Sequence, residues 1–544
     1  MASTLSSMNS TLSHALILMS SILPFDDSRA NDASASHQAA TGDRVGEFAQ
    51  HGDIGDPTLR GNTSYDASAQ TYHMSAAGTN LWGGEDEFQF AWNHIEGDFI
   101  LRTRFEFLGE GVDAHRKAGW MVRSDLDTGS TYADACVHGD GLTSLQFRRE
   151  KNGETDQLKV EDLLNGTYPD VIQFERRGTT FIFSAARYGE PFKSVELSDL
   201  ELPDRVYVGL FLCSHNADVV EQVTFRDVRI IKPAAPDFRP YNDYIGSTME
   251  ILDVFTGELT AIHSSAEPFE APNWTTDGQK LIMNISGNGT AKGVLRTFDL
   301  ATRRIETLNT GPRVQNNNDH VLTFDGSMLA ISNHTGPDRK STIFTLPVTG
   351  SDEPTQITDP AWGDSYLHGW SPDAKWITYT ANRNNQWDIY KVHVDTKQEV
   401  QLTDNNTLDD GPEYSPDGEW IYFNSTRTGL MQIWRMRPDG SDQQPVFSDN
   451  YQNWFPHISP DGKWMTVISY DPAIVEATDH PYYKHVLIRL LPIPTSSAEA
   501  LAKENGSAAP KVIAYVYGGQ GTINVPSWSP DSRRIAFVSN SDLP

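Results

Sequence analysis

The pattern of apolar and polar positions predicts strands along most of this chain of 544 residues. From about residue 45 onward, short runs alternate apolar and polar side chains, and Gly, Pro, Asn and Asp separate the runs. Alternation with period two, bounded by turn residues, is typical of half-buried β-strands. We therefore predict an all-β protein.

The C-terminal half contains one turn sequence that can be aligned six times on its aspartate. The copies are PNWTTDG at Asp277, HVLTFDG at Asp325, HGWSPDA at Asp373, PEYSPDG at Asp417, PHISPDG at Asp461 and PSWSPDS at Asp531. Successive aspartates lie 48, 48, 44, 44 and 70 residues apart, so the fifth repeat carries an insertion. Pro presets φ and Gly accepts positive φ, which suits Pro-Asp-Gly to a tight turn.

Each repeat is predicted to form four short strands, which is typical of a β-propeller blade. The sixth copy ends at Pro544 after two strands, and Ser247–Ala266, before the first copy, supplies two more. Pairing the two ends of the domain would close the ring and remove exposed strand edges. We therefore predict six blades over residues 244–544, the last one shared between both ends.

The repeated W-SPDG turn followed by an I-Y/F strand resembles the TolB-type, WD-like propeller repeat over about residues 243–544. The resemblance implies a six-bladed fold. TolB-like proteins include periplasmic proteins that bind other proteins, while related propellers precede peptidase domains or form sugar-acid lyases. Fold resemblance alone therefore leaves binding and catalysis both open.

Residues 45–232 carry alternating strand patterns without the repeated turn. The predicted strands are Phe99–Gly109, Lys117–Asp125, Leu142–Glu150, Thr180–Gly189, Val206–Asn216 and Glu221–Ile231. They predict an antiparallel β-sandwich. The phrases NLWGGEDEFQFAW, KAGWMVRS and VYVGLFLCSHN resemble a concanavalin-like, laminin-G-type sandwich. That resemblance implies carbohydrate binding, and Trp82, Glu85, Asp86 and Trp92 are candidate contacts. Of these four, we predict Trp82 as a binding residue. A spacer without a ligand is the alternative, and the proline-containing residues 233–243 form the predicted linker.

Residues 1–44 are predicted to be a signal-like or disordered N-terminus. The apolar run Ala15–Leu23 is too short to span a membrane but suits a secretory signal, with Ala33 to Ala35 as a cleavage region. The two cysteines, Cys136 and Cys213, are expected to be buried free thiols. A formal net charge of -30 argues against nucleic-acid binding. We expect a periplasmic or secreted protein without a transmembrane segment.

The strand that precedes each repeated turn is predicted to be the innermost strand of its blade, so its side chains converge on the axis. Four residues before the turn aspartate stand Asn273, Val321, Gly369, Glu413, His457 and Ser527. Glu413 and His457 are expected to approach one another from neighbouring blades. We take both, with Lys484 of the fifth-repeat insertion, as candidate catalytic residues.

Two histidines break the repeat one residue earlier, where the other copies have proline. His320 and His368 occupy that position and, with His457, are candidate ligands of a divalent metal ion. Strict strand alternation would instead point His320 and His368 sideways. Further candidate binding residues lie in the segments that open the blades, after the turns and in the insertion. They are Asp319, Asp409, Arg427, Asn453, Trp454 and His480.

These residues support three functional hypotheses. The first is binding of a carbohydrate or other polymer at the propeller mouth. The second is a metal-dependent polysaccharide lyase or hydrolase acting on an acidic glycan in the propeller channel, which resembles oligogalacturonate-lyase propellers by position and not by motif. The third is a Tol-type scaffold that binds an envelope protein.

Overall fold

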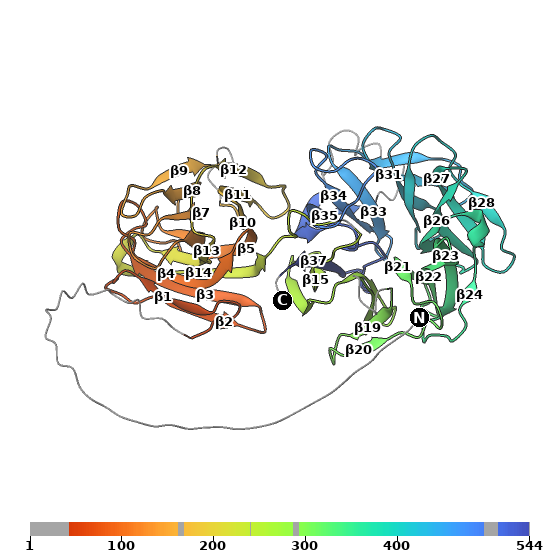
Figure 1. Cartoon of the computed structure of the whole chain (residues 1–544), viewed down its shortest axis with the longest axis horizontal. Helices are drawn as coiled ribbons and strands as arrows, with labels where there is room; N and C mark the ends of the chain where they lie inside the picture. Colours follow the sequence, from red (N-terminus) through yellow and green to blue (C-terminus); the bar gives the residue numbers. More distant parts are fainter. Residues whose placement is uncertain (1–42, 161–167, 240, 287–292, 494–509, 543–544) are drawn as a thin grey trace, which may run out of the picture. The chain divides into compact units, whose positions relative to one another are not determined.

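The computed structural model describes residues 43–160, 168–239, 241–286, 293–493 and 510–542 (Figure 1). The predicted secretory signal, Ala15–Leu23, lies outside the described residues. Within the described ranges, no helix is both long and apolar enough to cross a membrane. The one helical turn assigned there is the short 3-10 element η1 (Pro360–Trp362). The all-β prediction is confirmed for these ranges.

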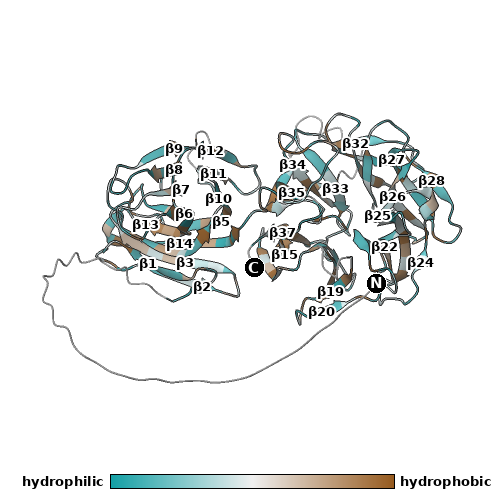
Figure 2. Cartoon of the chain, in the orientation of Figure 1, coloured by the Kyte–Doolittle hydropathy of each residue, from teal (hydrophilic) through white to brown (hydrophobic). Residues whose placement is uncertain are grey.

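The N-terminal part of the described chain contains two seven-stranded antiparallel sheets, which we call the two-sheet region. The first sheet has the order β1 (Gln50–Ile54), β4 (Phe88–Glu96), β13 (Arg205–Cys213), β6 (Lys117–Arg123), β7 (Tyr132–His138), β8 (Thr143–Arg148) and β9 (Asp156–Lys159). The second has the order β12 (Lys193–Leu197), β11 (Thr180–Ala186), β10 (Val171–Arg177), β5 (Phe99–Leu108), β14 (Asn216–Ile231), β3 (Thr71–Gly78) and β2 (Asn62–Asp66). Apolar positions are seen on strands of both sheets in Figure 2.

One hydrophobic core joins the two sheets of this region. Trp120 and Leu210 of the first sheet pack in the same cluster as Phe105, Phe174 and Phe225 of the second. The other face of the first sheet was expected to be half exposed, and this expectation is wrong, because β6, β7 and β8 are buried along their whole length. A second cluster covers that outer face, including Trp92 and both cysteines, which are free thiols as predicted.

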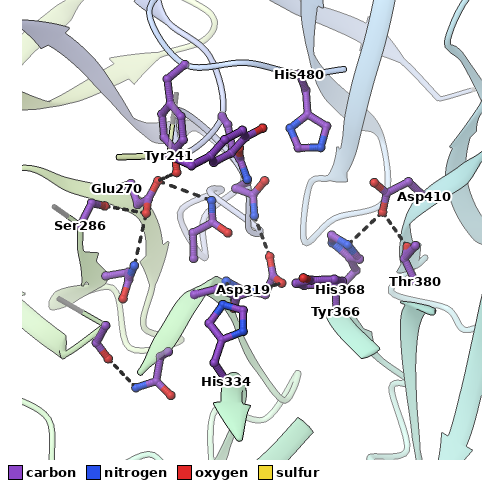
Figure 3. Close-up of a pocket in the computed structure, with 18 of the residues that line it drawn as sticks. Tyr241, Glu270, Ser286, Asp319, His334, Tyr366, His368, Thr380, Asp410 and His480 are labelled. Carbon is purple, nitrogen blue, oxygen red and sulfur yellow. Dashed lines mark hydrogen bonds and ion pairs between the residues drawn. The ribbon is translucent and has the colours of Figure 1, made fainter. Parts of the chain in front are cut away.

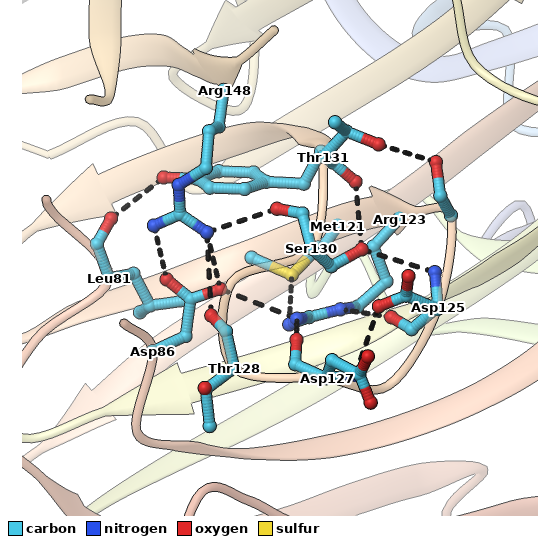
Figure 4. A network of polar contacts seen from close by, with 12 residues as sticks. Leu81, Asp86, Met121, Arg123, Asp125, Asp127, Thr128, Ser130, Thr131 and Arg148 are labelled. Atoms are coloured by element: carbon cyan, nitrogen blue, oxygen red, sulfur yellow. Dashed lines mark hydrogen bonds and ion pairs between the residues drawn. The ribbon is translucent and has the colours of Figure 1, made fainter. Parts of the chain in front are cut away.

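Polar loops also cover the outer face, as Figure 4 shows around Asp86. Asp86 is completely buried and forms ion pairs with Arg148 at 2.7 Å and with Arg123 at 3.3 Å. The Tyr132 hydroxyl donates a hydrogen bond to the backbone carbonyl of Leu81 at 2.7 Å. Asp86 therefore holds a loop onto the sheet.

The C-terminal part is a six-bladed propeller, as predicted. The first two blades are β17 (Phe269–Trp274), β18 (Lys280–Ile285), β19 (Leu295–Asp299), β20 (Ile305–Thr307), and β21 (Asn316–Leu322), β22 (Met328–Thr335), β23 (Lys340–Pro347), β24 (Thr355–Gln356). The third and fourth are β25 (Ser365–Trp370), β26 (Trp376–Arg383), β27 (Gln386–His393), β28 (Glu399–Gln401), and β29 (Asp409–Tyr414), β30 (Ile421–Ser425), β31 (Gln432–Met436), β32 (Gln444–Phe447). The fifth is β33 (Gln452–Ile458), β34 (Trp464–Tyr470), β35 (Lys484–Pro492), β36 (Lys511–Gly518).

The sixth blade closes the ring with strands from both ends of the domain. Its sheet has the order β16 (Leu259–Ser265), β15 (Gly246–Asp253) and β37 (Arg534–Ser541). β15 and β37 pair in antiparallel register from Gly246 opposite Ser541 to Asp253 opposite Arg534. The innermost position is a single bridge between Trp528 and Ile535. The predicted closure is confirmed, and its last inner strand is shorter than in the other blades.

A short hydrogen-bond cycle explains the repeated turn. In all six copies a hydroxyl donates to the turn aspartate. Ser529 donates to Asp531 in the sixth copy, and in the other five the distance is 2.6 Å, from Thr275, Thr323, Ser371, Ser415 and Ser459. In the fifth copy the Asp461 carboxylate also accepts from the backbone of Lys463 at 3.1 Å, and Ser459 Oγ accepts from the backbone of Trp464 at 3.0 Å. Such local bonds satisfy backbone donors in the turn, so the motif is structural.

Candidate functional site

A cavity of about 940 Å³ lies where the inner strands of the blades meet (Figure 3). β17, β21, β25, β29 and β33 each form one edge of their sheet, and each of these strands contacts the next one in this order. These strands are therefore innermost, as predicted. The cavity also takes side chains from the fifth-blade insertion, through His480 and Tyr482, and from the segment before β15, through Tyr241 and Tyr244.

The cavity-lining side chains follow a simple position in the repeat. Seven residues before the turn aspartates stand Glu270, Asn318, Tyr366, Asp410, Trp454 and Asn524. All of these except Trp454 line the cavity. The sequence reasoning instead chose the position four residues before the aspartate, and none of the side chains at that position lines it.

A β-bulge in each of these five inner strands explains the difference. The register shifts between Glu270 and Asn273 in β17 and between Asp410 and Glu413 in β29, with equivalent shifts in β21, β25 and β33. A bulge adds one unpaired residue and changes which side chains share a face. Strict alternation therefore does not hold along these strands, and His368 points into the cavity.

Glu270 forms one side of the cavity, within a ring of neutral hydrogen-bond donors. Its carboxylate accepts from Ser286 Oγ at 2.5 Å, the Tyr482 hydroxyl at 3.0 Å and Asn284 Nδ2 at 3.3 Å. Among the described residues, no Lys, Arg or His side chain pairs with Glu270 within 4.0 Å. Burial, only partly offset by these hydrogen bonds, raises the pKa of Glu270.

Asp319, His368 and Asp410 form the opposite side of the cavity. His368 Nε2 lies 3.2 Å from Asp410 Oδ1, and Thr380 Oγ1 donates to the same oxygen at 2.6 Å. Burial alone would raise the pKa of Asp410, but the bond to His368 outweighs it and brings the value to about 2. Burial disfavours charge on His368 too, but Asp410 and Asp319 outweigh it and raise the His368 pKa.

Asp319 behaves differently from Asp410 although both are near His368. Burial raises the pKa of Asp319 to about 6, despite the charge of His368 and hydrogen bonds from Asn317 and Asn524. The Asn524 amide donates to Asp319 Oδ1 at 2.8 Å. Asp319 can therefore gain or lose a proton near neutral pH, whereas Asp410 stays ionised.

Aromatic rings line the remaining cavity wall. Tyr366 and Trp387 lie 5.8 Å apart between ring centroids, and Tyr482 contacts Tyr241 at 5.6 Å. The insertion also places the His480 ring 5.3 Å from that of Phe455. Burial lowers the pKa of His480, and its Nδ1 is buried without a hydrogen-bond partner in the structure.

Among the predicted residues, Asp319, His368 and His480 are brought together at this cavity. Glu413 and His457 approach one another as expected, with His457 Nδ1 2.7 Å from Glu413 Oε2. His457 Nε2 faces the carbonyl of Ile523, so both ring nitrogens are engaged in contacts between blades. The pair is outside the cavity lining, and so is Lys484, the first residue of β35. Their catalytic role stays a prediction.

Four other predicted residues are in buried structural contacts. Arg427 donates to both carboxylate oxygens of Asp409, at 3.1 and 2.9 Å. Asn453 and Trp454 were expected in a loop facing the mouth, but they lie inside strand β33 and are fully buried. Asn453 donates to Asp449 at 3.0 Å, while Trp454 packs beneath the His480 ring at 4.4 Å. The expectation of exposed loop residues is wrong.

The three predicted metal-ligand histidines are not gathered in one place. His320 is completely buried and its Nε2 lies 3.3 Å from the Ile282 carbonyl, while His368 and His457 each pair with a different carboxylate. Burial lowers the pKa of His320 to about 4. Among the described residues, no group of three His, Cys, Asp or Glu side chains is arranged to hold a metal ion. The donor set present therefore does not fit a metal.

Candidate contacts in the two-sheet region also separate into two groups. Asp86 and Trp92 are completely buried, so they are not surface contacts. Trp82 keeps 40% of its surface exposed and lines a smaller, second cavity. Glu270 and Tyr366 were not predicted from the sequence, although the position in the repeat that they share with Asp410 would have identified them.

The fold and its axial cavity define a six-bladed β-propeller protein whose blades share a repeated hydroxyl–aspartate turn. A family model described as the TolB beta propeller domain matches residues 363–484. An uncharacterized protein of Agrobacterium fabrum is 40% identical over 293 residues, which are 54% of this chain and 92% of that protein. The chain belongs to this family of TolB-like β-propeller proteins, as the repeated turn predicted.

Solved structures show similar matches. A putative TolB from Agrobacterium tumefaciens is 39% identical, with a TM-score of 0.49, and the match covers 56% of this chain and 100% of that one. TolB from Acinetobacter baumannii is 14% identical, with a TM-score of 0.36, and the match covers 46% of this chain and 64% of that one.

Proposed function

We propose that this protein binds a neutral, hydroxyl-rich carbohydrate in the cavity at the propeller mouth. The observation that carries the proposal is the combination, in one cavity of about 940 Å³, of aromatic rings with carboxylates and amides from several blades. Sugar rings stack on aromatic faces, while carboxylates and amides exchange hydrogen bonds with sugar hydroxyls. A volume at the upper end of the usual range for ligand sites suits an oligosaccharide.

Unpartnered polar atoms support a ligand in this cavity. His480 Nδ1, Asn284 Oδ1 and Gln520 Oε1 are buried and have no hydrogen-bond partner in the structure. Buried polar atoms without partners are costly, and sugar hydroxyls can both donate to and accept from them. Glu270, which lies among neutral donors only, would repel an anionic ligand. A neutral sugar therefore suits the site better than an acidic glycan.

The two-sheet region fits the same proposal. Its two sheets with a shared core are consistent with a concanavalin-like sandwich, a class that often accompanies glycan-active domains. Together the two parts suggest a periplasmic or secreted protein that holds a polysaccharide or oligosaccharide. Fractionation of cells that produce the full-length chain tests the compartment, and recovery only in the cytoplasm would contradict it.

Binding can be tested with matched tryptophan variants. Titration calorimetry with neutral oligosaccharides should detect binding, and Trp387→Ala should weaken it at least about tenfold, since stacking contacts contribute on the order of 1–2 kcal/mol. Trp376→Ala is the control, because Trp376 lies in the same blade outside the cavity lining. Equal affinities for the two variants, or no binding to any neutral oligosaccharide, would contradict the proposal.

Hydrolysis of the bound glycan is the second candidate function. The observation that favours it is the difference between Asp319, with a pKa of about 6, and Asp410, with a pKa of about 2, on one cavity wall. Separated pKa values of two carboxyls suit an acid and a base in glycoside hydrolysis. Asp319 would donate the proton to the leaving oxygen, and Asp410 would stay ionised.

Catalysis has its own test. Asp319→Asn should abolish release of reducing ends while leaving oligosaccharide binding within about threefold, since the amide cannot donate a proton as an acid. Turnover should be unaffected by a chelator, because the donor groups described above do not fit a metal ion. Absence of turnover in the natural protein would leave binding as the function, and turnover that a chelator abolishes would favour the metal-dependent lyase.

Protein binding is the third candidate, and membership of the TolB-like family favours it. An envelope protein would then be the partner. Crosslinking in intact cells tests this candidate, and an envelope protein recovered equally with Trp387→Ala and the natural chain would place that partner outside the cavity.

A further inference from the structure

A second cavity, of about 210 Å³, lies on the outer face of the first sheet of the two-sheet region. Strand register places its side chains next to one another, because Lys117 of β6 lies opposite His138 of β7, and Gln146 of β8 lies opposite Gln157 of β9. The cavity is smaller than the roughly 300–1,000 Å³ typical of sites for drug-sized ligands, so its ligand would be small.

Lys117 supplies a buried positive charge at this cavity. The side chain is only 2% exposed, and Nζ donates one hydrogen bond, to Asn80 Oδ1 at 2.9 Å. Among the described residues, no carboxylate oxygen lies within 4.0 Å of Nζ, in contrast to Arg123 and Arg148 on the same face. An ammonium group has three donors, so Lys117 can bind an anionic group of a ligand.

Three titratable side chains lie around Lys117. Burial and the charge of Lys117 lower the pKa of His138 to about 3, so this imidazole is neutral. The same two causes, burial first, lower the pKa of His215. Burial raises the pKa of Asp134, the buried carboxyl next to this cluster, well above its usual value, although the charge of Lys117 opposes this shift.

Neutral polar atoms without partners surround this charge. Gln146 Oε1, Gln157 Oε1 and His215 Nδ1 are all buried and have no hydrogen-bond partner in the structure. Gln146 itself is 1% exposed. Native proteins leave few such atoms unsatisfied, so three at one small cavity indicate groups that a ligand with hydroxyls would complete.

Trp82 lies at the same cavity and gives it an exposed aromatic face. It keeps 40% of its surface exposed, whereas Trp92 and Trp120 of the same region are completely buried. We propose that this cavity binds a single sugar that carries a carboxylate, a hexuronic acid. Its carboxylate binds Lys117, its hydroxyls bind Gln146, Gln157 and His215, and its ring packs against Trp82. This site is independent of the carbohydrate proposed at the propeller mouth.

Calorimetry on the full-length chain with glucuronate, glucose and acetate tests the proposal. Glucuronate should bind at least about tenfold more tightly than either of the others, because only it has both carboxylate and ring. Lys117→Met should weaken glucuronate binding at least about tenfold. Lys159→Met is the matched control, an exposed lysine on strand β9 of the same sheet, and should bind as the natural chain does.

Further variants keep the result interpretable. If Lys117→Met does not fold, Trp82→Ala at the rim should still fold and should lose glucuronate affinity at least about tenfold. Trp387→Ala at the propeller mouth should leave glucuronate binding unchanged. The proposal is overturned if glucuronate does not bind, if acetate or inorganic phosphate binds as tightly, or if Trp82→Ala binds glucuronate normally.

Discussion

Asp86 in the two-sheet region and Glu270 in the propeller are both buried carboxylates, but their partners differ in charge. Asp86 contacts two arginines, Arg148 through both of its oxygens and Arg123 through one (Figure 4). Both guanidinium groups are also bonded to backbone carbonyls, such as Ser130 O at 3.0 Å from Arg148. This network closes a loop over a sheet.

Glu270 instead accepts hydrogen bonds from neutral side chains and faces a cavity (Figure 3). Its charge is solvated by dipoles, and burial raises its pKa. Lys117 is the positively charged counterpart, since it is buried beside a cavity and has no carboxylate partner within 4.0 Å among the described residues. Asp86, paired with two arginines, therefore closes a loop, whereas Glu270 and Lys117, which lack an oppositely charged partner in the part of the chain that the structure describes, each lie beside a cavity.

The largest expected effect on stability is at Asp86, the buried carboxylate that pairs with two arginines. Asp86→Asn should lower the free energy of unfolding by about 3–5 kcal/mol, because two buried arginines would lose the one carboxylate that pairs with them among the described residues. Denaturant unfolding followed by fluorescence measures this change. Asp127→Asn is the control in the same network, since its ion pair with Lys151 is exposed and should contribute less than about 1 kcal/mol. Equal effects of the two substitutions would refute the structural role of Asp86.

The propeller could be predicted from the sequence because its signals are local. The repeated hydroxyl–aspartate turn is satisfied within a few residues, so Ser459 and Asp461 specify it without help from distant parts. Ring closure followed from counting strands, and β15 and β37 pair as that count required. Local chemistry repeated six times is a stronger signal than any single motif.

The position of the cavity could not be predicted by alternation, because bulges change the phase of the inner strands. Ala271 and Phe455 have positive φ values of 57° and 52° at the bulges of β17 and β33, although neither is a glycine. Only Gly411, with φ of 63° in β29, signals this conformation by its residue type. The sequence therefore predicts correctly that His457 and Glu413 lie close together, but the pair lies outside the cavity lining.

Burial of the outer face of the first sheet was also hidden from the sequence. Alternation predicts which residues share a face, and along β6 it puts Trp120 on the opposite face from Lys117. It does not reveal that loops return to cover the polar face. Asp86 looked like an exposed candidate for this reason, and only its contacts with Arg123 and Arg148 identify it as structural.

The second effect concerns a carboxyl whose proton is retained near neutral pH. The folded pKa of Asp319 is about 6, above its ordinary value of 3.8, so the folded state holds this proton more strongly than the unfolded state. Stability should be lost as pH rises through this interval. Relative to Asp319→Asn, the natural protein should lose about 3 kcal/mol of unfolding free energy between about pH 4 and pH 7.

Denaturant unfolding at several pH values measures this difference, and a second aspartate gives a control of opposite sign. Hydrogen bonds from Thr323 and Ser327 lower the pKa of Asp325 to about 2, so its stabilising effect is present above the unfolded pKa and is lost as pH falls. Asp325→Asn should therefore be most destabilising at neutral pH. A pH-independent difference for Asp319→Asn would show that its carboxyl titrates normally.

The smallest effect on stability is expected at Glu270. Glu270→Gln keeps the size of the side chain and an oxygen that can accept from Ser286, so the free energy of unfolding should change by no more than about 1 kcal/mol. Because burial raises the folded pKa of Glu270, its charge opposes folding as pH rises, and any change at neutral pH should favour the variant. Oligosaccharide affinity should nevertheless fall about tenfold, since a charged acceptor is lost.

Calorimetry and denaturant unfolding on the same preparation separate the two parts of this prediction. Glu267→Gln is the control, because Glu267 lies close by in the sequence and its ion pair with Arg296 is partly exposed. A loss of several kcal/mol for Glu270→Gln, similar to that for Asp86→Asn, would mean that the charge of Glu270 is needed for folding. Glu270 would then have a structural role like that of Asp86, and the contrast between the two carboxylates would fail. A loss of oligosaccharide affinity without a loss of stability would instead locate the ligand beside Glu270.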